Sequence, residues 1–240
     1  MDGLLVIDKP VGITSHDVVA RARRALAEPR VGHTGTLDPA ASGVLPLVLG
    51  RATRLARFLS AADKAYEGVV RLGVTTDTYD AAGEIVGSAY EGSLPSLGDI
   101  DRALDAFRGT FLQWPPAFSA KKIGGTRSYV LARRSRTASR ASQPDPLGAE
   151  PNGASGPEGA GPGPTPLPVA VTAYSIAILS GAGDTVTLRV ECSGGFYIRA
   201  LAHDLGARLG VGAHLTALRR IRSGTHTLEG AVELAVLERD

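Results

Sequence analysis

The stretch Thr-Val-Thr-Leu-Arg-Val-Glu at residues 185–191 alternates apolar and polar side chains and gives the clearest strand signal in the chain. Its apolar residues (Val186, Leu188 and Val190) would face one side of a sheet, and its polar residues would face the other. Four further stretches rich in Val, Leu and Ile also predict strands. They lie at residues 4–7, 44–49, 66–75 and 171–179. The fold is therefore expected to be built around a sheet.

Helical stretches separate these strands at irregular intervals. Ser15 and Ser96 each stand before a segment with helical apolar periodicity and can cap a helix. The predicted helices cover residues 16–27, 52–62, 96–107, 196–209 and 231–238. Because strands and helices mix without a regular strand–helix–strand rhythm, we expect an α+β fold with a mixed, largely antiparallel sheet flanked by helices and loops.

The composition indicates one folded domain over residues 1–240, since 43% of the 240 residues are hydrophobic. No stretch is apolar for the length that a membrane span needs, and the N-terminus lacks the basic flank and cleavage pattern of a signal peptide. Cys192 is the only cysteine, and the five histidines show no zinc-binding spacing. We therefore expect a cytoplasmic protein without a structural metal ion.

The charges are unevenly distributed, although the net charge is only +2. Residues 106–144 contain no Asp or Glu but eight Lys or Arg, so the rest of the chain carries 18 basic and 24 acidic side chains. Such a basic segment suits a phosphate backbone. The alternative is an ordinary solvated basic face. Within it, residues 115–140 combine basic side chains with Phe118 and Tyr129, as expected of an RNA-gripping arm.

Residues 144–168 differ from the rest of the chain, because they hold eight Pro and six Gly among 25 residues. With almost no large apolar side chains, this segment cannot offset the entropy of ordering by burying surface. We interpret it as a disordered insertion within the domain. A linker between two domains is the alternative.

The chemistry is expected in the loop Gly-His-Thr-Gly-Thr-Leu-Asp-Pro at residues 32–39. Its glycines and Pro39 fix the backbone, and Asp38 offers a carboxylate in a loop on a rigid scaffold. The alternative is a structural Asx turn, in which Asp38 bonds nearby amides. The phosphate-binding glycine motifs of nucleotide-binding proteins do not occur in the sequence.

Several motifs together resemble the bacterial tRNA pseudouridine synthase B family. Each is weak alone, but they follow the family order and cover nearly everything outside the insertion. They lie at residues 5–10, 12–19, 31–39, 64–66, 76–83, 114–120, 125–129, 192–199 and 212–220. The resemblance implies a pseudouridine synthase-like catalytic domain acting on tRNA, at the T-arm uridine numbered 55.

The resemblance also implies roles for individual residues. Asp38 would be the catalytic carboxylate, Arg199 would pair with it, and Tyr66 would stack on the uracil and remove the C5 proton. The nucleotide would be received by His33, Tyr66, Tyr197 and Leu218. From the clusters of basic residues rather than from the resemblance, contacts to the RNA would come from Lys122, Arg127, Arg133, Arg219 and Arg220.

These residue types suit the isomerisation of uridine. The base must leave C1′ of the ribose, turn and reattach through C5, so nothing is oxidised or imported and no cofactor is expected. Asp38 could attack the sugar or the base, or take a proton from the sugar, and the sequence leaves these routes open. Tyr197 and Arg199 are two residues apart and would share a face in an extended turn. The target base would have to be flipped out of the folded RNA.

The chain departs from the family at Lys121, where an apolar residue is usual, and in its long insertion. It also stops soon after Arg222, so we expect the small C-terminal RNA-binding domain of many relatives to be absent. We expect no membrane association and no obligate protein partner. Two alternatives remain: a non-catalytic RNA-binding or RNA-folding module, and a lyase or hydrolase built on an Asp–Arg pair.

Overall fold

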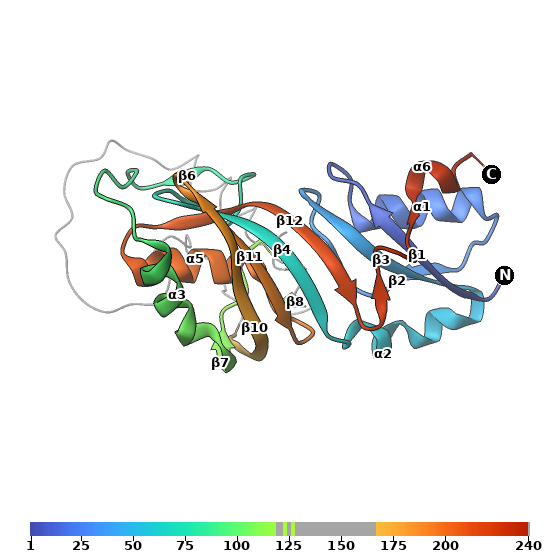
Figure 1. Cartoon of the computed structure of the whole chain (residues 1–240). Helices are drawn as coiled ribbons and strands as arrows, with labels where there is room; N and C mark the ends of the chain where they lie inside the picture. The colour runs from blue at the N-terminus through green and yellow to red at the C-terminus, as the bar shows by residue number, and fades with distance from the viewer. Residues whose placement is uncertain (119–121, 124–125, 128–166, 240) are drawn as a thin grey trace.

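The computed structural model describes residues 1–118, 122–123, 126–127 and 167–239. In this part of the chain, a ten-stranded sheet runs through the whole molecule in the order β14-β1-β3-β12-β4-β11-β10-β7, with β2 beside β3 and β13 beside β12 (Figure 1). Its strands are β1 (Gly3–Lys9), β2 (Val31–His33), β3 (Ala41–Leu49), β4 (Lys64–Leu72), β7 (Gly109–Gln113), β10 (Val169–Ala182), β11 (Thr185–Cys192), β12 (Ala213–Ser223), β13 (His226–Thr227) and β14 (Val232–Glu233).

The sheet is mixed and largely antiparallel, which confirms the predicted α+β class. Among the described strand pairs of this sheet, only β1–β14 and β3–β12 run parallel. The strand predicted from the alternation at residues 185–191 is β11, which pairs along its length with β4. Its Val186, Leu188 and Val190 are all buried in the core. The period-two pattern therefore identified one face of the central sheet correctly.

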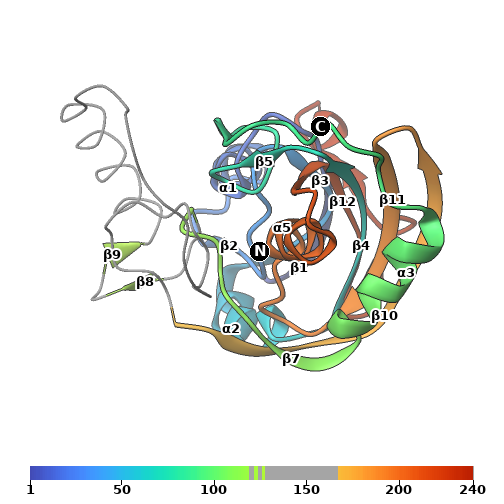
Figure 2. The ribbon, with the colours of Figure 1, turned by 90° about the vertical axis from the view of Figure 1, so that its left-hand side faces the viewer.

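Helices cover the sheet at both ends. They are α1 (Ser15–Ala25), α2 (Ala56–Ser60), α3 (Leu97–Leu104), α5 (Ile198–Leu209) and α6 (Leu234–Leu237). Figure 1 shows α1 and α6 against β1 and β3, while α5 and α3 lie at the other end. In Figure 2 the strands from β4 to β7 curve around α5, so this helix lies on their concave side. The first turn of α5 is thereby placed against the centre of the sheet.

Two helix predictions needed correction. The N-cap of α1 is Thr14 rather than Ser15, with Asp17 completing a capping box. The Ser15 hydroxyl instead bonds Leu37, in the loop after β2. The helix predicted over residues 52–62 is a 3-10 helix, η1 (Gly50–Leu55), followed by the short α2. The predicted cap at Ser96 is present and forms a full capping box with Asp99.

The sequence did not predict strand β12, although it is central and joins β3 to β4. Its pairing with β4 shifts register between Leu215 and Ala217 and again between Arg220 and Arg222. These bulges break the period-two alternation that would have identified a strand. The edge strand β7 was missed as well.

Parts of the predicted arm and insertion lie outside the described residues. Within the arm, β8 (Lys122–Ile123) and β9 (Thr126–Arg127) pair antiparallel. Arg133 and nearly all of the segment 144–168 are not described, so their predicted roles remain predictions. Among the helices that the structure describes, none has the length and apolar character needed to cross a membrane.

Candidate active site

The loop between β2 and β3 presents Asp38 at the surface, with 41% of its side chain exposed. Buried groups fix the loop from below. The Ser15 hydroxyl accepts from the Leu37 amide at 2.9 Å and donates to the Leu37 carbonyl at 3.1 Å. The Ala41 amide donates to the Asp38 carbonyl at 3.0 Å. The carboxylate therefore projects from a backbone whose polar groups are bonded on both sides of it.

The Lys9 ammonium holds the far side of this loop. Its Nζ donates to the Ala41 carbonyl at 2.6 Å and to the Pro10 carbonyl at 2.9 Å. Burial lowers the pKa of Lys9 to about 8, and the nearby Asp38 carboxylate opposes that shift. A buried cation thus anchors the loop through carbonyl groups.

Arg199 makes an ion pair with Asp38, with Nε 2.9 Å from Oδ2. Its side chain is only 7% exposed, and the same Nε lies 3.6 Å from Oδ2 of Asp80. Its two Nη atoms donate to the carbonyls of Thr78 and Phe118, each at 2.9 Å. The guanidinium is therefore fixed on all sides, and it restricts the angle at which Asp38 can stand.

The spacing of Tyr197 and Arg199 predicted that the two residues share an extended turn, and this prediction was wrong. Tyr197 is the N-cap of α5 and Arg199 belongs to its first turn. Gln113 at the end of β7 fixes this junction, because its side chain bonds both the amide (2.8 Å) and the carbonyl (3.0 Å) of Tyr197. The two side chains nevertheless border one pocket.

The sequence also missed a support behind Arg199. Tyr79 stands between two of its partners, Thr78 and Asp80, in a left-handed backbone conformation with φ +64°. Its ring stacks on that of His203 at 3.8 Å, one helical turn beyond Arg199 on α5. The motif at residues 76–83 contains Thr78 and Asp80, but no spacing rule connects it with α5.

A pocket with a cavity volume of about 240 Å³ lies between the Asp38 loop, β4, β12 and the start of α5. It brings together five residues that the resemblance placed at the site, namely Asp38, Tyr66, Tyr197, Arg199 and Leu218. His33 does not line it. The His33 ring lies 5.4 Å from that of His16, and its Nδ1 accepts from the Gly35 amide.

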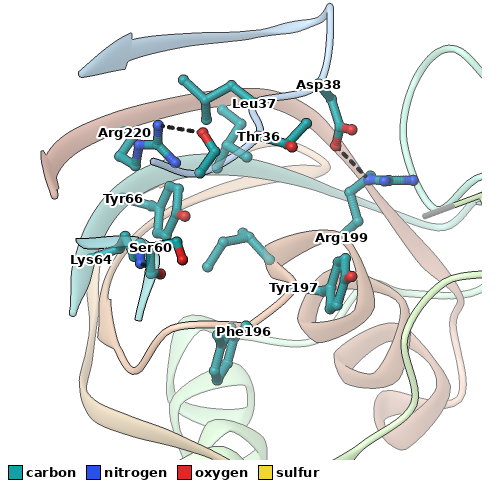
Figure 3. A pocket seen from close by; sticks show the side chains of 14 residues that line it. Thr36, Leu37, Asp38, Ser60, Lys64, Tyr66, Phe196, Tyr197, Arg199 and Arg220 are labelled. Carbon is teal, nitrogen blue, oxygen red and sulfur yellow. Dashed lines mark hydrogen bonds and ion pairs between the residues drawn. The ribbon is translucent and has the colours of Figure 1, made fainter. Parts of the chain in front are cut away.

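Figure 3 shows that the pocket has two different ends. Asp38 and Arg199 lie on one side, and Tyr66, Arg220 and Lys64 lie on the other. Tyr66 is 8% exposed, and burial raises the pKa of its phenol. Arg220 opposes that rise through its charge and a side-chain hydrogen bond. Burial likewise lowers the pKa of Lys64.

The position of Arg220 does not fit the predicted contact with RNA from the surface. It is 1% exposed, and its Nε and Nη2 donate to the carbonyls of Val44 (2.7 Å) and Gly35 (3.1 Å). Its neighbour Arg219 is partly exposed and bonds Asp8 at 2.6 Å. Since adjacent residues of a strand face opposite sides, only Arg219 remains accessible for a phosphate.

Lys122 and Arg127 belong to β8 and β9 of the arm, and their backbones pair with each other. Among the residues described, no group of three or more His, Cys, Asp or Glu side chains could hold a metal ion. Cys192 is a free, buried thiol.

Two family models match the chain. A model described as TruB family pseudouridylate synthase (N terminal domain) matches residues 23–145, and one described as tRNA pseudouridylate synthase B C-terminal domain matches residues 199–240. The latter region runs from α5 through β12 to α6, so it includes the central strand β12 of the sheet.

Curated relatives named tRNA pseudouridine synthase B match almost the whole chain. The protein of Solibacter usitatus is 47% identical over 99% of this chain and 72% of its own length. That of Heliobacterium modesticaldum is 41% identical over 99% of this chain and 70% of its own length. That of Mycobacterium avium is 44% identical over 97% of this chain and 68% of its own length.

Solved structures show the same fold. A chain in the crystal structure of a Cbf5-Nop10-Gar1 complex is 31% identical and matches with a TM-score of 0.67, over 97% of this chain and 52% of that one. A chain in an archaeal box H/ACA sRNP Nop10-Cbf5 complex is 30% identical, with a TM-score of 0.64, over 99% of this chain and 53% of that one. The present chain therefore spans about half the length of these structural neighbours.

Proposed function

The chain belongs to the tRNA pseudouridine synthase B family, and from this membership we propose that it converts the uridine at position 55 in the T-arm of tRNA into pseudouridine. The observation that carries the proposal is the Asp38 carboxylate, held 2.9 Å from Arg199 at the mouth of a pocket that also contains Tyr66. A non-catalytic RNA-binding module would have no use for a carboxylate in that place, since phosphate groups would repel it.

Asp38 is the group that acts on the ribose. A carboxylate fixed by a guanidinium can bond to C1′ or take a sugar proton, and both routes release uracil with the electron pair of the N1–C1′ bond. The base then turns and bonds to C1′ through C5, while Asp38 either leaves C1′ as a carboxylate or returns the proton to the sugar. The proton leaves C5 and another is taken up at N1, so atoms and charge balance without a cofactor.

The rest of the pocket receives the flipped nucleotide. Flipping costs a few kcal/mol, which stacking and edge hydrogen bonds in the pocket offset. Tyr66 stacks on the uracil and takes the C5 proton, while Tyr197 and Leu218 form the walls. His33 supports the Asp38 loop from its base through the Gly35 amide.

The RNA backbone is gripped by the arm and by the exposed edge of β12. Lys122, Arg127 and Arg133 contact phosphates of the T-arm, and Arg219 extends this track. Replacing the three arm residues together with Glu would weaken tRNA binding more at low salt than at high salt, because fewer counterions would be released on binding. We expect the chain to act on tRNA without an obligate protein partner.

The test is direct. The purified chain is incubated with an unmodified tRNA transcript, and pseudouridine is mapped at single-nucleotide resolution. We expect conversion at the T-arm uridine, and none in a control transcript with cytidine at that position. Absence of pseudouridine, or its formation only at other positions, would contradict the proposal.

A further inference from the structure

Arg220 is a buried arginine whose charge no acid neutralises. Among the residues that the structure describes, no carboxylate oxygen lies within 4.0 Å of its guanidinium, whereas Arg199 has two such partners. Its bonds go to neutral groups, namely the carbonyls of Val44 and Gly35 and the Tyr66 phenol. A buried cation without a counter-charge is costly, and such groups concentrate where a charge is needed for function.

The guanidinium faces the pocket next to Tyr66. Residues 66 and 220 are direct partners across the antiparallel β4–β12 pair, so their side chains leave the sheet on the same face. Both line the pocket, and Figure 3 shows them together at the end opposite Asp38. Nη1 of Arg220 is the atom nearest to the place that a Cβ on Gly35 would occupy, at 3.4 Å. Arg220 therefore stands between the catalytic loop and the phenol.

We propose that Arg220 is the residue that enables Tyr66 to remove the C5 proton, by stabilising the phenolate form of Tyr66 inside the pocket. This inference rests on the proposed function and deepens it. It assigns Arg220 to the second half of the reaction, after C5 has bonded to C1′. Arg199, by contrast, serves the carboxylate that acts in the first half.

The proton balance of this step is simple. The Tyr66 hydroxyl gives its proton to water, and the phenolate oxygen then takes the proton from C5. The electrons of the C5–H bond restore the C5–C6 double bond of the ring, and N1 takes up a proton from water. The ring thus gains at N1 what it loses at C5, and the phenol ionises again for the next turnover.

The burial of Tyr66 explains why a cation is required there. Burial disfavours the charged form of a phenol and raises its pKa, as it does here. Among the groups that lower the pKa of Tyr66, Arg220 has the largest effect. Lys64 lines the same end of the pocket, but its ammonium donates to the carbonyls of Ser60 and Ala62 at the end of α2.

The experiment separates this role from a structural one by an isotope effect. Single-turnover rates at saturating enzyme are measured on tRNA transcripts made with ordinary uridine and with uridine carrying deuterium at C5. Arg220→Gln removes the charge but can still donate to the two loop carbonyls. Loss of one preorganised charge-stabilising donor costs about a hundredfold or more in rate. We therefore expect such a loss with tRNA affinity retained, and a C5 isotope effect at least about twofold above that of the wild type.

Two further variants keep the test decisive. Arg220→Lys retains the charge and should give a rate and an isotope effect between those of the wild type and Arg220→Gln. Arg189→Gln removes an arginine that pairs with Glu67 on the opposite face of the sheet from Tyr66, outside the pocket lining, and should match the wild type. Melting temperatures of all variants report on folding. If Arg220→Gln fails to fold, Arg220→Lys carries the test alone.

The proposal is overturned if a folded Arg220 variant is slowed without any change in the isotope effect, because Arg220 would then serve an earlier step or only the loop. It is also overturned if Arg220→Gln reacts at the wild-type rate. In both cases the wild-type chain would still form pseudouridine, so failure of this inference is distinguishable from failure of the proposed function.

Discussion

Arg199 and Arg220 border one pocket, but the structure holds them in opposite ways. Arg199 lies against two carboxylates, those of Asp38 and Asp80. Among the residues that the structure describes, Arg220 has no acid partner; it bonds the carbonyls of Val44 and Gly35 and the Tyr66 phenol. One arginine has its charge matched by acids, whereas the other keeps an unmatched charge inside the fold.

The difference indicates a division of work along the pocket. A guanidinium paired with acids fixes their geometry, because its planar fork allows few orientations. A guanidinium without an acid partner stabilises negative charge that appears during the reaction. The Asp38 end is therefore suited to breaking the bond to the ribose, and the Tyr66 end to the proton transfer at C5.

The largest expected effect is at the carboxylate itself. Asp38→Asn keeps the shape of the side chain but can act neither as nucleophile nor as base. Turnover should fall on the order of 10⁴-fold or more, as when a principal catalytic group is removed. Binding of tRNA should survive, and a filter-binding titration measures it beside the rate. Near-normal pseudouridine formation by this variant would show that Asp38 does not take part in the chemistry. The division of the pocket into two ends would then be wrong as well.

The next effect concerns the orientation of that carboxylate. Arg199→Lys retains a charge but loses the fork that contacts Asp38, Thr78 and Phe118. A displacement of about 1 Å can cost on the order of a hundredfold in rate. Single-turnover rates of Arg199→Lys should fall by that factor, and its C5 isotope effect should not rise. In Arg220→Gln, by contrast, the C5 isotope effect should rise. Rates equal to the wild type would mean that a simple charge suffices.

A smaller effect is expected behind Arg199. The stack of Tyr79 on His203 holds the segment that supplies Thr78 and Asp80 to the guanidinium. Aromatic pairs contribute about 0.5–1.5 kcal/mol, so Tyr79→Gly should slow the reaction about threefold to tenfold. Tyr79→Phe keeps the ring and serves as the control. If both variants match the wild type, the stack does not support Arg199.

The smallest effect on catalysis is expected at Asp204, which lies on α5 with Arg199. Burial raises the pKa of Asp204 to about 6 from its ordinary value of 3.8. Because folding favours the protonated form, the stability that this group provides is complete below about pH 4 and is lost as the pH rises through about 6. The charged carboxylate therefore weakens the fold at pH 8.

Asp204→Asn should raise the free energy of unfolding by about 1–2 kcal/mol at pH 8 and by little near pH 4. Urea unfolding at the two pH values measures this difference. The turnover rate should stay the same, because Asp204 touches neither arginine of the pocket. An equal gain at both pH values would show that the charge of Asp204 is not the cause.

Much of the fold could be predicted from the sequence where local rules suffice. The alternation in β11 and the cap at Ser96 are local patterns, and both were identified. Strand β12 was missed because its two bulges disturb the alternation. That omission also hid Arg220, because the burial of a side chain on an unrecognised strand cannot be predicted.

The candidate site was less accessible to local rules. Asp38, Tyr66 and Arg199 came from the ordered family motifs, since no spacing connects residues so far apart in the chain. Asp80 and the stack of Tyr79 on His203 became visible only when the segment after β4 was placed against α5. Such contacts depend on tertiary packing, which periodicity does not report.

The most direct test of the two-ended pocket is a crystal structure of the Asp38→Asn variant bound to a T-arm stem-loop RNA. We expect a flipped uracil in the pocket, with the ribose C1′ next to the substituted side chain and C5 able to turn toward the Tyr66 hydroxyl. Arg220 should contact that hydroxyl. A base that remains stacked in the RNA, or a ribose lying at the Tyr66 end, would contradict it.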